Sequence, residues 1–332
     1  MITGHGDDTY RYEGITMNFS SNICYSADTE PLKTYLRTRM DVISSYPEPE
    51  AYRLEKVIAE RRGVDAGNVV VTAGAVDAIY LIAQALRTSC STYTVRRPTF
   101  SEYDDACSMF GYTEGPDGIY WFCCPNNPTG EFHILEESAG SSRYIIIDRS
   151  YEAYVKTSDE APHVAANSSL FAPHSSLMEV HSMTKTFSIP GLRLGYIIAR
   201  DDICALLRRN MRPWAVNALA IEAGLWLMEN DVAGIPDINA WLENASRLRD
   251  ALNAVEGITA YPSQTPFMMC RVKGMTAAEL KETLAKHYGM LIRDLSNIRG
   301  LTPYHFRICA RSGEENHALV EAIGKCLKRV TW

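Results

Sequence analysis

The sequence lacks several features that would assign its class at once. No apolar run approaches the roughly 20 residues that a membrane-spanning helix needs. The nine cysteines are scattered without repeated C-x-x-C pairs, so neither a metal site nor a disulfide framework is predicted. No basic cluster stands out and the net charge is −7, which argues against nucleic acid as a partner. The polar, acidic N-terminus is not typical of a signal or transit peptide, so we expect a cytoplasmic protein with reduced thiols.

What is present is the composition of an ordinary globular protein. The chain has 332 residues, 46% hydrophobic and 22% charged, which predicts about two domains. From about Asn68, short apolar runs alternate with segments of helical period. Strands that are apolar on both faces belong in a sheet that helices cover on both sides. We therefore predict an α/β domain with a mainly parallel sheet sandwiched by helices; its strands are expected at 68–72, 91–97, 118–124, 143–148, 177–183 and 194–199.

The pattern changes after Arg200. Three helices follow, and the tail then alternates between short strands and helices, which predicts a smaller α+β unit. The first 30 or so residues contain no strong periodic element, and we expect them to pack against that unit. The predicted division is a large domain at 31–235 and a small domain formed by 1–30 and 236–332.

Residues that follow the predicted strands are candidates for a ligand site, because open parallel sheets bind ligands beyond the carboxyl ends of their strands. Gly74 opens a helix at Ala75 and Val76, whose free N–H groups suit a phosphate. Phe100 is either a core aromatic or a platform for a flat ring. Asn127 lies in the rigid loop "PNNPTG", and Asp148 ends a very apolar strand, where a carboxylate calls for a cationic partner.

The stretch "VHSMTKTFSIPGLRLGYIIA" frames a single lysine, Lys185, between two predicted strands. Most lysines are solvated surface charges and need no such frame. The hydroxyls of Ser182 and Thr184 precede this lysine, and Arg193 follows it by eight residues.

Taken together, these segments resemble the active site of the fold type I pyridoxal-phosphate enzymes, the aminotransferase superfamily, over nearly the whole chain. The resemblance implies that Lys185 binds pyridoxal 5'-phosphate covalently and that Asp148 accepts the pyridinium N–H. It also implies that Tyr151 and Asn127 bond the phenolic oxygen and that Phe100 stacks on the ring. The phosphate would be held by Gly74, Ala75, Val76, Ser182, Thr184 and Arg193.

The same resemblance implies an assembly. The segment "SSYPEPEAYRLEKVIA" is similar to one in which a tyrosine, here Tyr46, reaches the coenzyme phosphate of the neighbouring subunit. The expected unit is a homodimer with shared active sites.

Two arginines and one histidine are candidates for substrate binding, together with Asn127. In the superfamily, the position of Arg307 binds the substrate's α-carboxylate; the alternative is a salt bridge at a strand end. The segments "GHGDDTYRY", "RPWAVNALA" and "LIRDLSNIRGLTPYHFRICARS" resemble the threonine-phosphate decarboxylases of cobalamin synthesis. A substrate with a carboxylate and a phosphate needs two cationic anchors, for which Arg293 and Arg307 are predicted. His5 is either a third anchor or a mobile terminal residue.

The predicted reaction is decarboxylation of L-threonine O-3-phosphate to (R)-1-amino-2-propanol O-2-phosphate. The alternative is histidinol-phosphate aminotransferase or a related amino-acid transaminase, which uses the same coenzyme and breaks a different bond. A non-catalytic ligand-sensing domain of the same fold is a third possibility, although no helix-turn-helix pattern precedes Asn18. The chain departs from the superfamily in short segments around 111–121 and 131–143 and in "DRSY" after the key aspartate.

Overall fold

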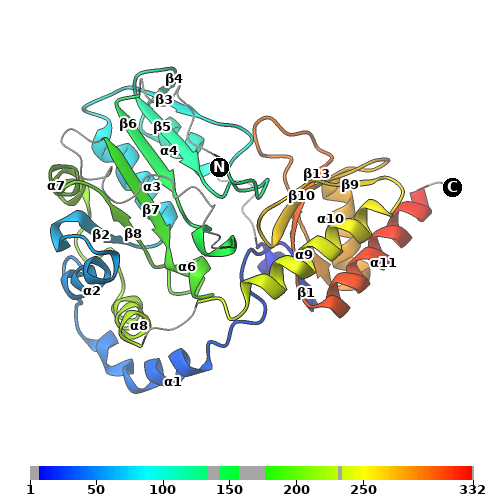
Figure 1. Ribbon diagram of the computed structural model, residues 1–332, viewed down its shortest axis with the longest axis horizontal. Helices are drawn as coiled ribbons and strands as arrows, with labels where there is room; N and C mark the ends of the chain where they lie inside the picture. The colour runs from blue at the N-terminus through cyan, green and yellow to red at the C-terminus, as the bar shows by residue number, and fades with distance from the viewer. Residues whose placement is uncertain (1–6, 134–141, 157–175, 231–233, 331–332) are drawn as a thin grey trace.

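The chain folds into two units that lie side by side (Figure 1). The computed structural model describes residues 7–133, 142–156, 176–230 and 234–330. Within these ranges, no helix combines the length and the apolar character needed to cross a membrane.

The large unit is built on a seven-stranded sheet in the order β2-β8-β7-β6-β5-β3-β4. Its neighbouring strands run parallel, except that β8 is antiparallel to both β2 and β7. The prediction of a mainly parallel sheet is therefore confirmed, with one reversed strand. The strands are β2 (Val69–Thr72), β3 (Thr92–Val95), β4 (Thr113–Glu114), β5 (Ile119–Cys123), β6 (Tyr144–Asp148), β7 (Leu177–Ser182) and β8 (Gly195–Ile198).

Helices cover both faces of this sheet, which explains why its central strands are apolar throughout (Figure 1). Val69 and Val71 of β2 pack in the core layer of α2 (Tyr52–Arg62) and α8 (Ala218–Glu229). Val70, pointing the other way, packs in the layer of α3 (Ala75–Leu86), α4 (Glu102–Met109) and α7 (Asp201–Asn210). Helix α1 (Glu30–Thr38) and the 3₁₀ turn η2 (Met40–Ser44) lie beside α8.

The small unit is an α+β layer. Its antiparallel sheet has the order β12-β13-β10-β9 and packs with three helices around one core. The strands are β9 (Ile258–Ala260), β10 (Phe267–Val272), β11 (Met290–Leu291), β12 (Arg293–Asp294) and β13 (His305–Cys309). The helices are α9 (Ile238–Asn253), α10 (Ala277–Tyr288) and α11 (Gly313–Val330).

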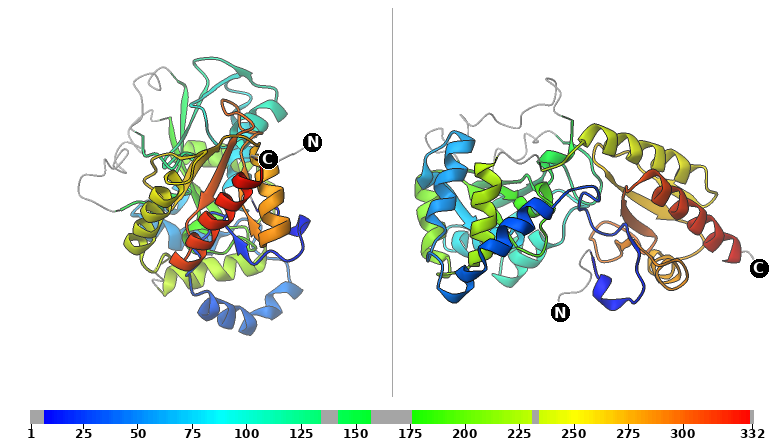
Figure 2. Two further views of the ribbon diagram at one scale, coloured as in Figure 1. Left: turned by 90° about the vertical axis from the view of Figure 1, so that its right-hand side faces the viewer. Right: turned by 90° about the horizontal axis from the view of Figure 1, so that it is seen from below.

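The N-terminal segment starts on the small unit and then crosses to α1 on the large one (Figure 2). Strand β1 (Met17–Asn18) pairs in parallel with β11, and Phe19 and Cys24 belong to the core of the small unit. These contacts agree with the predicted association of residues 1–30 with residues 236–332, whose limits stay a prediction.

Candidate active site

A pocket of about 320 Å³ lies at the carboxyl ends of the large sheet's parallel strands and is lined by residues of both units. Of the residues predicted from sequence, the structure gathers there Ala75, Val76, Phe100, Asn127, Asp148, Tyr151, Ser182, Thr184, Lys185, Arg193 and Arg307. Gly74 adjoins the pocket as the residue before Ala75. Tyr46 and Arg293 are not among its lining residues, and His5 lies outside the described part of the chain.

Lys185 projects from the short helix α6 (Met183–Thr186), which follows β7 without a break. Burial, reinforced by the positive charges of Arg307 and Arg193, lowers the pKa of the Lys185 amine to about 8. Its Nζ lies 5.9 Å from the centroid of the Tyr151 ring. A lysine with this pKa is partly neutral near physiological pH, so it can act as a nucleophile and as a proton carrier.

One end of the pocket is suited to an anion. Gly74 caps α3 with a φ of +89°, and a Cβ there would approach Arg193 Nη2 to 2.8 Å. A Cβ on Gly195 would lie 2.9 Å from the backbone nitrogen of Ala75. Both glycines therefore allow β8 and Arg193 to come close to the first turn of a 12-residue helix. Its free N–H groups, its dipole and the Arg193 guanidinium favour a phosphate here.

Asp148 lies at the last position of β6, where its side chain enters the pocket. The residue is only 3% exposed, and each of its carboxylate oxygens accepts a hydrogen bond. Oδ1 accepts from the backbone nitrogen of Ser150 at 2.8 Å, and Oδ2 accepts from the hydroxyl of Tyr103 at 2.7 Å. A cationic partner was predicted for this carboxylate, but both of these bonds come from neutral donors of the chain.

The pocket is also lined by residues that were not predicted from the sequence, among them Asn22 and Tyr103. Asn22 Nδ2 donates to the hydroxyl of Tyr151 at 3.2 Å, and burial raises the pKa of that tyrosine to about 12. Tyr103 follows Phe100 by three residues, and the two rings meet edge to face at 5.9 Å. Phe100 lies two residues before α4 begins, so helical periodicity does not relate the two rings, and no sequence signal pointed to Tyr103. Asn22 lies in an irregular segment and had none.

Arg307 enters the pocket from β13 of the small unit. Its Nη1 donates to Asn127 Oδ1 at 2.5 Å, and its Nη2 donates to the carbonyl oxygen of Ser20 at 2.7 Å. These acceptors are neutral, so the contacts differ from the salt bridge considered as an alternative. Among the residues that the structure describes, the buried Arg307 Nε and Asn22 Oδ1 find no hydrogen-bond partner. Burial lowers the pKa of this guanidinium, because a buried charge without a counter-ion is unfavourable. A ligand anion would offset this unfavourable energy and could accept a hydrogen bond from Nε.

Arg293 lies directly opposite Arg307 where β12 pairs with β13. Its side chain is 7% exposed, and Nη2 donates to Asn297 Oδ1 at 3.0 Å. Burial and the neighbouring charge of Arg307 lower its pKa to about 10. The structure thus places both predicted anchors on neighbouring strands, and of the two only Arg307 lines the pocket.

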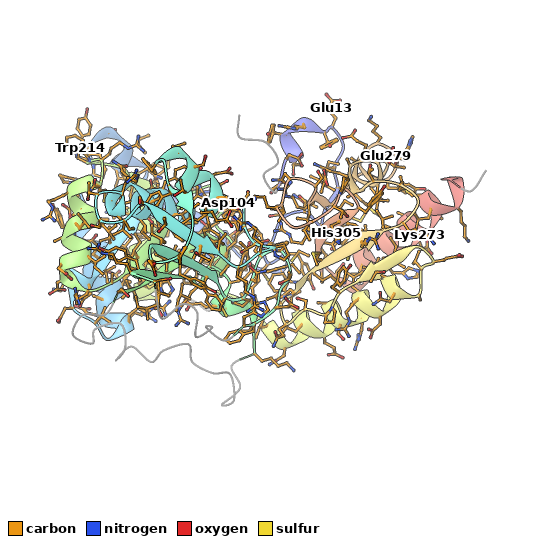
Figure 3. All side chains as sticks on the ribbon, turned by 90° about the horizontal axis from the view of Figure 1, so that it is seen from above. Glu13, Asp104, Trp214, Lys273, Glu279 and His305 are labelled. Carbon is orange, nitrogen blue, oxygen red and sulfur yellow. The ribbon has the colours of Figure 1, made fainter. Side chains whose placement is uncertain are left out.

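Tyr46 lies outside the pocket that contains Lys185. It is 84% exposed, and its ring contacts that of Trp214 with centroids 5.2 Å apart. Figure 3 shows Trp214 on the side of the large unit away from the small unit. Tyr46 therefore does not complete the pocket of its own chain.

A buried charge network supports the loop that carries Asp148 and Tyr151. His181, on β7, contacts Glu152 through Nδ1 at 3.0 Å and Glu179 through Nε2 at 3.2 Å. Arg149 Nε binds Glu179 at 2.5 Å, and Arg62 binds Glu152. Burial alone would lower the pKa of His181, but the two carboxylates outweigh it and raise the pKa. The residues next to Asp148, Tyr151 and Ser182 are thereby tied together.

Residues 112–323 match the model of the family described as aminotransferase class I and II. The chain belongs to this family. It is 28% identical to the threonine-phosphate decarboxylase of Salmonella typhimurium, over 94% of this chain and 91% of that protein. It is 27% identical to histidinol-phosphate aminotransferase 2 of Archaeoglobus fulgidus, over 92% of each chain.

A solved structure agrees with these relatives. The crystal structure of L-threonine-O-3-phosphate decarboxylase from Porphyromonas gingivalis matches with a TM-score of 0.86 and 32% identity, over 94% of this chain and 99% of that one. The predicted superfamily and fold are confirmed. The chain is an enzyme of the aminotransferase fold, and pyridoxal 5'-phosphate is its coenzyme.

The geometry of the pocket fits this coenzyme independently of the similarity to known proteins. A reactive amine, an anion site at a helix N-terminus and a buried carboxylate are the three donor or acceptor groups that its aldehyde, phosphate and ring nitrogen require. The backbone at Gly74 leaves no room for a Cβ beside Arg193. A glycine at this position allows the backbone to come close to a phosphate.

Proposed function

We propose that this enzyme decarboxylates L-threonine O-3-phosphate to (R)-1-amino-2-propanol O-2-phosphate in the synthesis of cobalamin. The observation that carries the proposal is the pair of buried arginines on opposed strands, Arg307 in the pocket and Arg293 next to it. A substrate with both a carboxylate and a phosphate offers two anions to this pair. The similarity to two threonine-phosphate decarboxylases, over more than nine-tenths of the chain, supports the same substrate.

Roles for the coenzyme contacts are part of the proposal. Lys185 binds the coenzyme covalently, and Asp148 accepts a hydrogen bond from the protonated ring nitrogen. Phe100 packs on the ring, while Tyr151 and Asn127 Nδ2 donate to its phenolic oxygen. Asn127 suits this role because Arg307 already occupies its Oδ1 and leaves the amide nitrogen as donor. The phosphate is held by the backbone after Gly74, at Ala75 and Val76, and by Ser182, Thr184 and Arg193.

The chemistry follows from how these residues hold a substrate. When bound, the coenzyme withdraws the electron pair that is released as a bond to the substrate's α-carbon breaks. Arg307 and Arg293 set which bond lies perpendicular to the ring by clamping the carboxylate and the phosphate. With a pKa of about 8, Lys185 carries a proton to the α-carbon after carbon dioxide leaves. Asn22, through Oδ1, offers the substrate one more acceptor.

Histidinol-phosphate aminotransferase is the second candidate, because relatives with that name match over most of the chain. Its substrate has one phosphate and no carboxylate, so only one of the two arginines would meet an anion in that half-reaction. Incubation with L-threonine O-3-phosphate separates the candidates. We expect carbon dioxide and a phosphorylated amine in equal amounts, and none with Lys185→Ala. Consumption of 2-oxoglutarate with histidinol phosphate, without carbon dioxide from threonine phosphate, would establish the transaminase.

We also propose that the working unit is a homodimer in which Tyr46 contacts the partner's coenzyme phosphate. Two observations support it: Tyr46 lies outside the pocket of its own chain, and it belongs to an exposed apolar surface. The exposed apolar side chains of this region are Met40, Ile43, Tyr46, Tyr52 and Trp214. In a two-fold symmetric dimer, a second copy of this chain would cover such a surface. The domain limits and the cytoplasmic location stay predictions.

A further inference from the structure

Tyr103 is a buried side chain that contacts both Phe100 and the carboxylate of Asp148. It lies in the first turn of α4 and is 0% exposed. Its hydroxyl donates to Asp148 Oδ2 at 2.7 Å, a residue 45 positions later in the chain. A phenol and a carboxylate at this distance form a charge-assisted hydrogen bond, which is about twice as strong as a neutral one.

Packing, and not this bond alone, holds the ring of Tyr103 in place. The ring stacks on Trp121 with centroids 5.2 Å apart and an interplanar angle of 18°. Its edge meets Phe100 at 5.9 Å and 85°. Trp121 is itself anchored, since its Nε1 contacts Cys107 Sγ at 3.3 Å. The hydroxyl is therefore presented to Asp148 by a rigid aromatic group, and a phenylalanine would fill the same space.

The hydroxyl keeps its proton at any working pH, so it remains able to donate to Asp148. Burial, with the negative charge of Asp148 added, raises the pKa of Tyr103 well above its ordinary value. The bond to Oδ2 and the bond from Ser150 to Oδ1 each use one lone pair of the carboxylate. The remaining lone pairs are free to accept a proton donor from the pocket. Each bond also draws off part of the negative charge that would otherwise compete for that donor's proton.

We propose that Tyr103 is a positioning residue that aims Asp148 at the coenzyme's ring nitrogen and keeps the proton they share on that nitrogen. The inference rests on the role of Asp148 proposed above and is independent of which substrate is used. A protonated ring nitrogen withdraws electrons more strongly, so the effect of Tyr103 reaches the reaction through Asp148. The side chain touches neither the substrate nor the bond that breaks.

The test uses the holoenzyme loaded with coenzyme that carries nitrogen-15 in the ring. The nitrogen-15 chemical shift is recorded against pH for wild type, Tyr103→Phe and Tyr112→Phe. Tyr112 is a matched control, because it is also buried and its hydroxyl donates to the Ala83 carbonyl at 2.9 Å, away from the pocket. For Tyr103→Phe we expect the nitrogen-15 shift at a fixed pH to move toward that of the unprotonated ring, because the carboxylate competes more strongly for the shared proton, with kcat about tenfold lower and KM nearly unchanged.

The results separate three cases. A Tyr103→Phe titration that coincides with that of Tyr112→Phe overturns the inference. If Asp148→Asn also leaves the nitrogen-15 shift unchanged, the proposed role of Asp148 fails as well; if it changes the shift, only Tyr103 is misassigned.

A second probe covers a Tyr103→Phe variant that does not fold. Insertion of 3-fluorotyrosine at position 103 keeps the shape and makes the phenol a stronger donor. The nitrogen-15 shift at a fixed pH should then move further toward that of the protonated ring than in wild type. An unchanged titration with this residue would refute the inference.

Discussion

The two sides of the pocket differ in how completely the chain satisfies its own polar groups. On the large-unit side, both oxygens of Asp148 accept hydrogen bonds within the chain. On the small-unit side, Arg307 Nε and Asn22 Oδ1 are buried and accept or donate no hydrogen bond within the described part of the chain. Buried polar atoms without partners are costly, so they are expected where a ligand supplies the missing contact. The coenzyme side is thus built in advance, whereas the substrate side is completed by the substrate.

The two units also meet through charges near this junction. Arg299 of the small unit contacts Asp104 at 3.3 Å and Glu114 at 3.1 Å, and both acids also bind Arg97 of the large unit. Figure 3 shows Asp104 near the junction with the small unit. Ion pairs of Arg299, whose side chain is 57% exposed, contribute little energy singly.

The largest effect is expected at Lys185. Lys185→Ala should lower turnover by roughly 10²–10⁴-fold or more, because it removes both the covalent link and the proton carrier. Borohydride should attach the coenzyme to Lys185 in wild type, as checked by peptide mapping. The variant should still bind coenzyme without a covalent bond, since Asp148 and the phosphate contacts remain. An adduct mapped to another lysine would show that the large-unit side is wrongly assigned.

The next largest effects are expected at the two arginines of the small unit. Arg307→Ala should weaken every amino-acid ligand by roughly 10- to 150-fold, as loss of a charge-assisted bond predicts. Arg293→Ala should weaken mainly the phosphorylated ligands. Binding of threonine and threonine phosphate to both variants is the measurement. Equal losses for the two ligands in Arg293→Ala would remove its role as phosphate anchor.

A third prediction concerns Tyr46, which belongs to neither side of its own pocket. Tyr46→Ala and Lys185→Ala chains, unfolded together in equal amounts and refolded, should give about half mixed dimers. Each mixed dimer has one site with both defects and one with neither. About a quarter of wild-type activity should return, well above either parent. Mixed dimers no more active than the parents' average would place Tyr46 outside the shared site.

The smallest effect is a pH dependence of the stability that the charge network around His181 contributes. The pKa of His181 is raised in the folded state, so its contribution to stability is complete below its unfolded pKa of about 6.5 and is lost as pH rises through the folded value. The free energy of unfolding of wild type should therefore fall relative to that of His181→Asn as pH increases above neutrality. Urea titrations from about pH 6 to pH 9 measure it. His317→Asn, at an exposed histidine, is the control, and identical pH profiles for wild type and His181→Asn would exclude the network's contribution.

Much of the site was predictable because its residues lie at recognisable points of regular elements. Gly74 starts a helix, Asp148 ends a strand, and Lys185 directly follows another; each lies beside an apolar run whose period is visible in the sequence. The ends of neighbouring parallel strands meet at one edge of a sheet, so these residues were expected together. Tyr103 was missed, because it lies inside α4 and its contact with Asp148 depends on how two distant segments pack.

The sequence by itself determined the alternation of strands and helices, the two-unit composition and the family motifs around Lys185. Only the tertiary structure decided that β8 runs antiparallel, that Tyr103 meets Asp148, and that Asn22 and Arg307 have atoms left for a ligand. The reason is physical: periodicity reflects which face of one element is buried. The partner of a side chain depends on how distant segments pack, as with Arg307 and the Ser20 carbonyl, 287 residues apart.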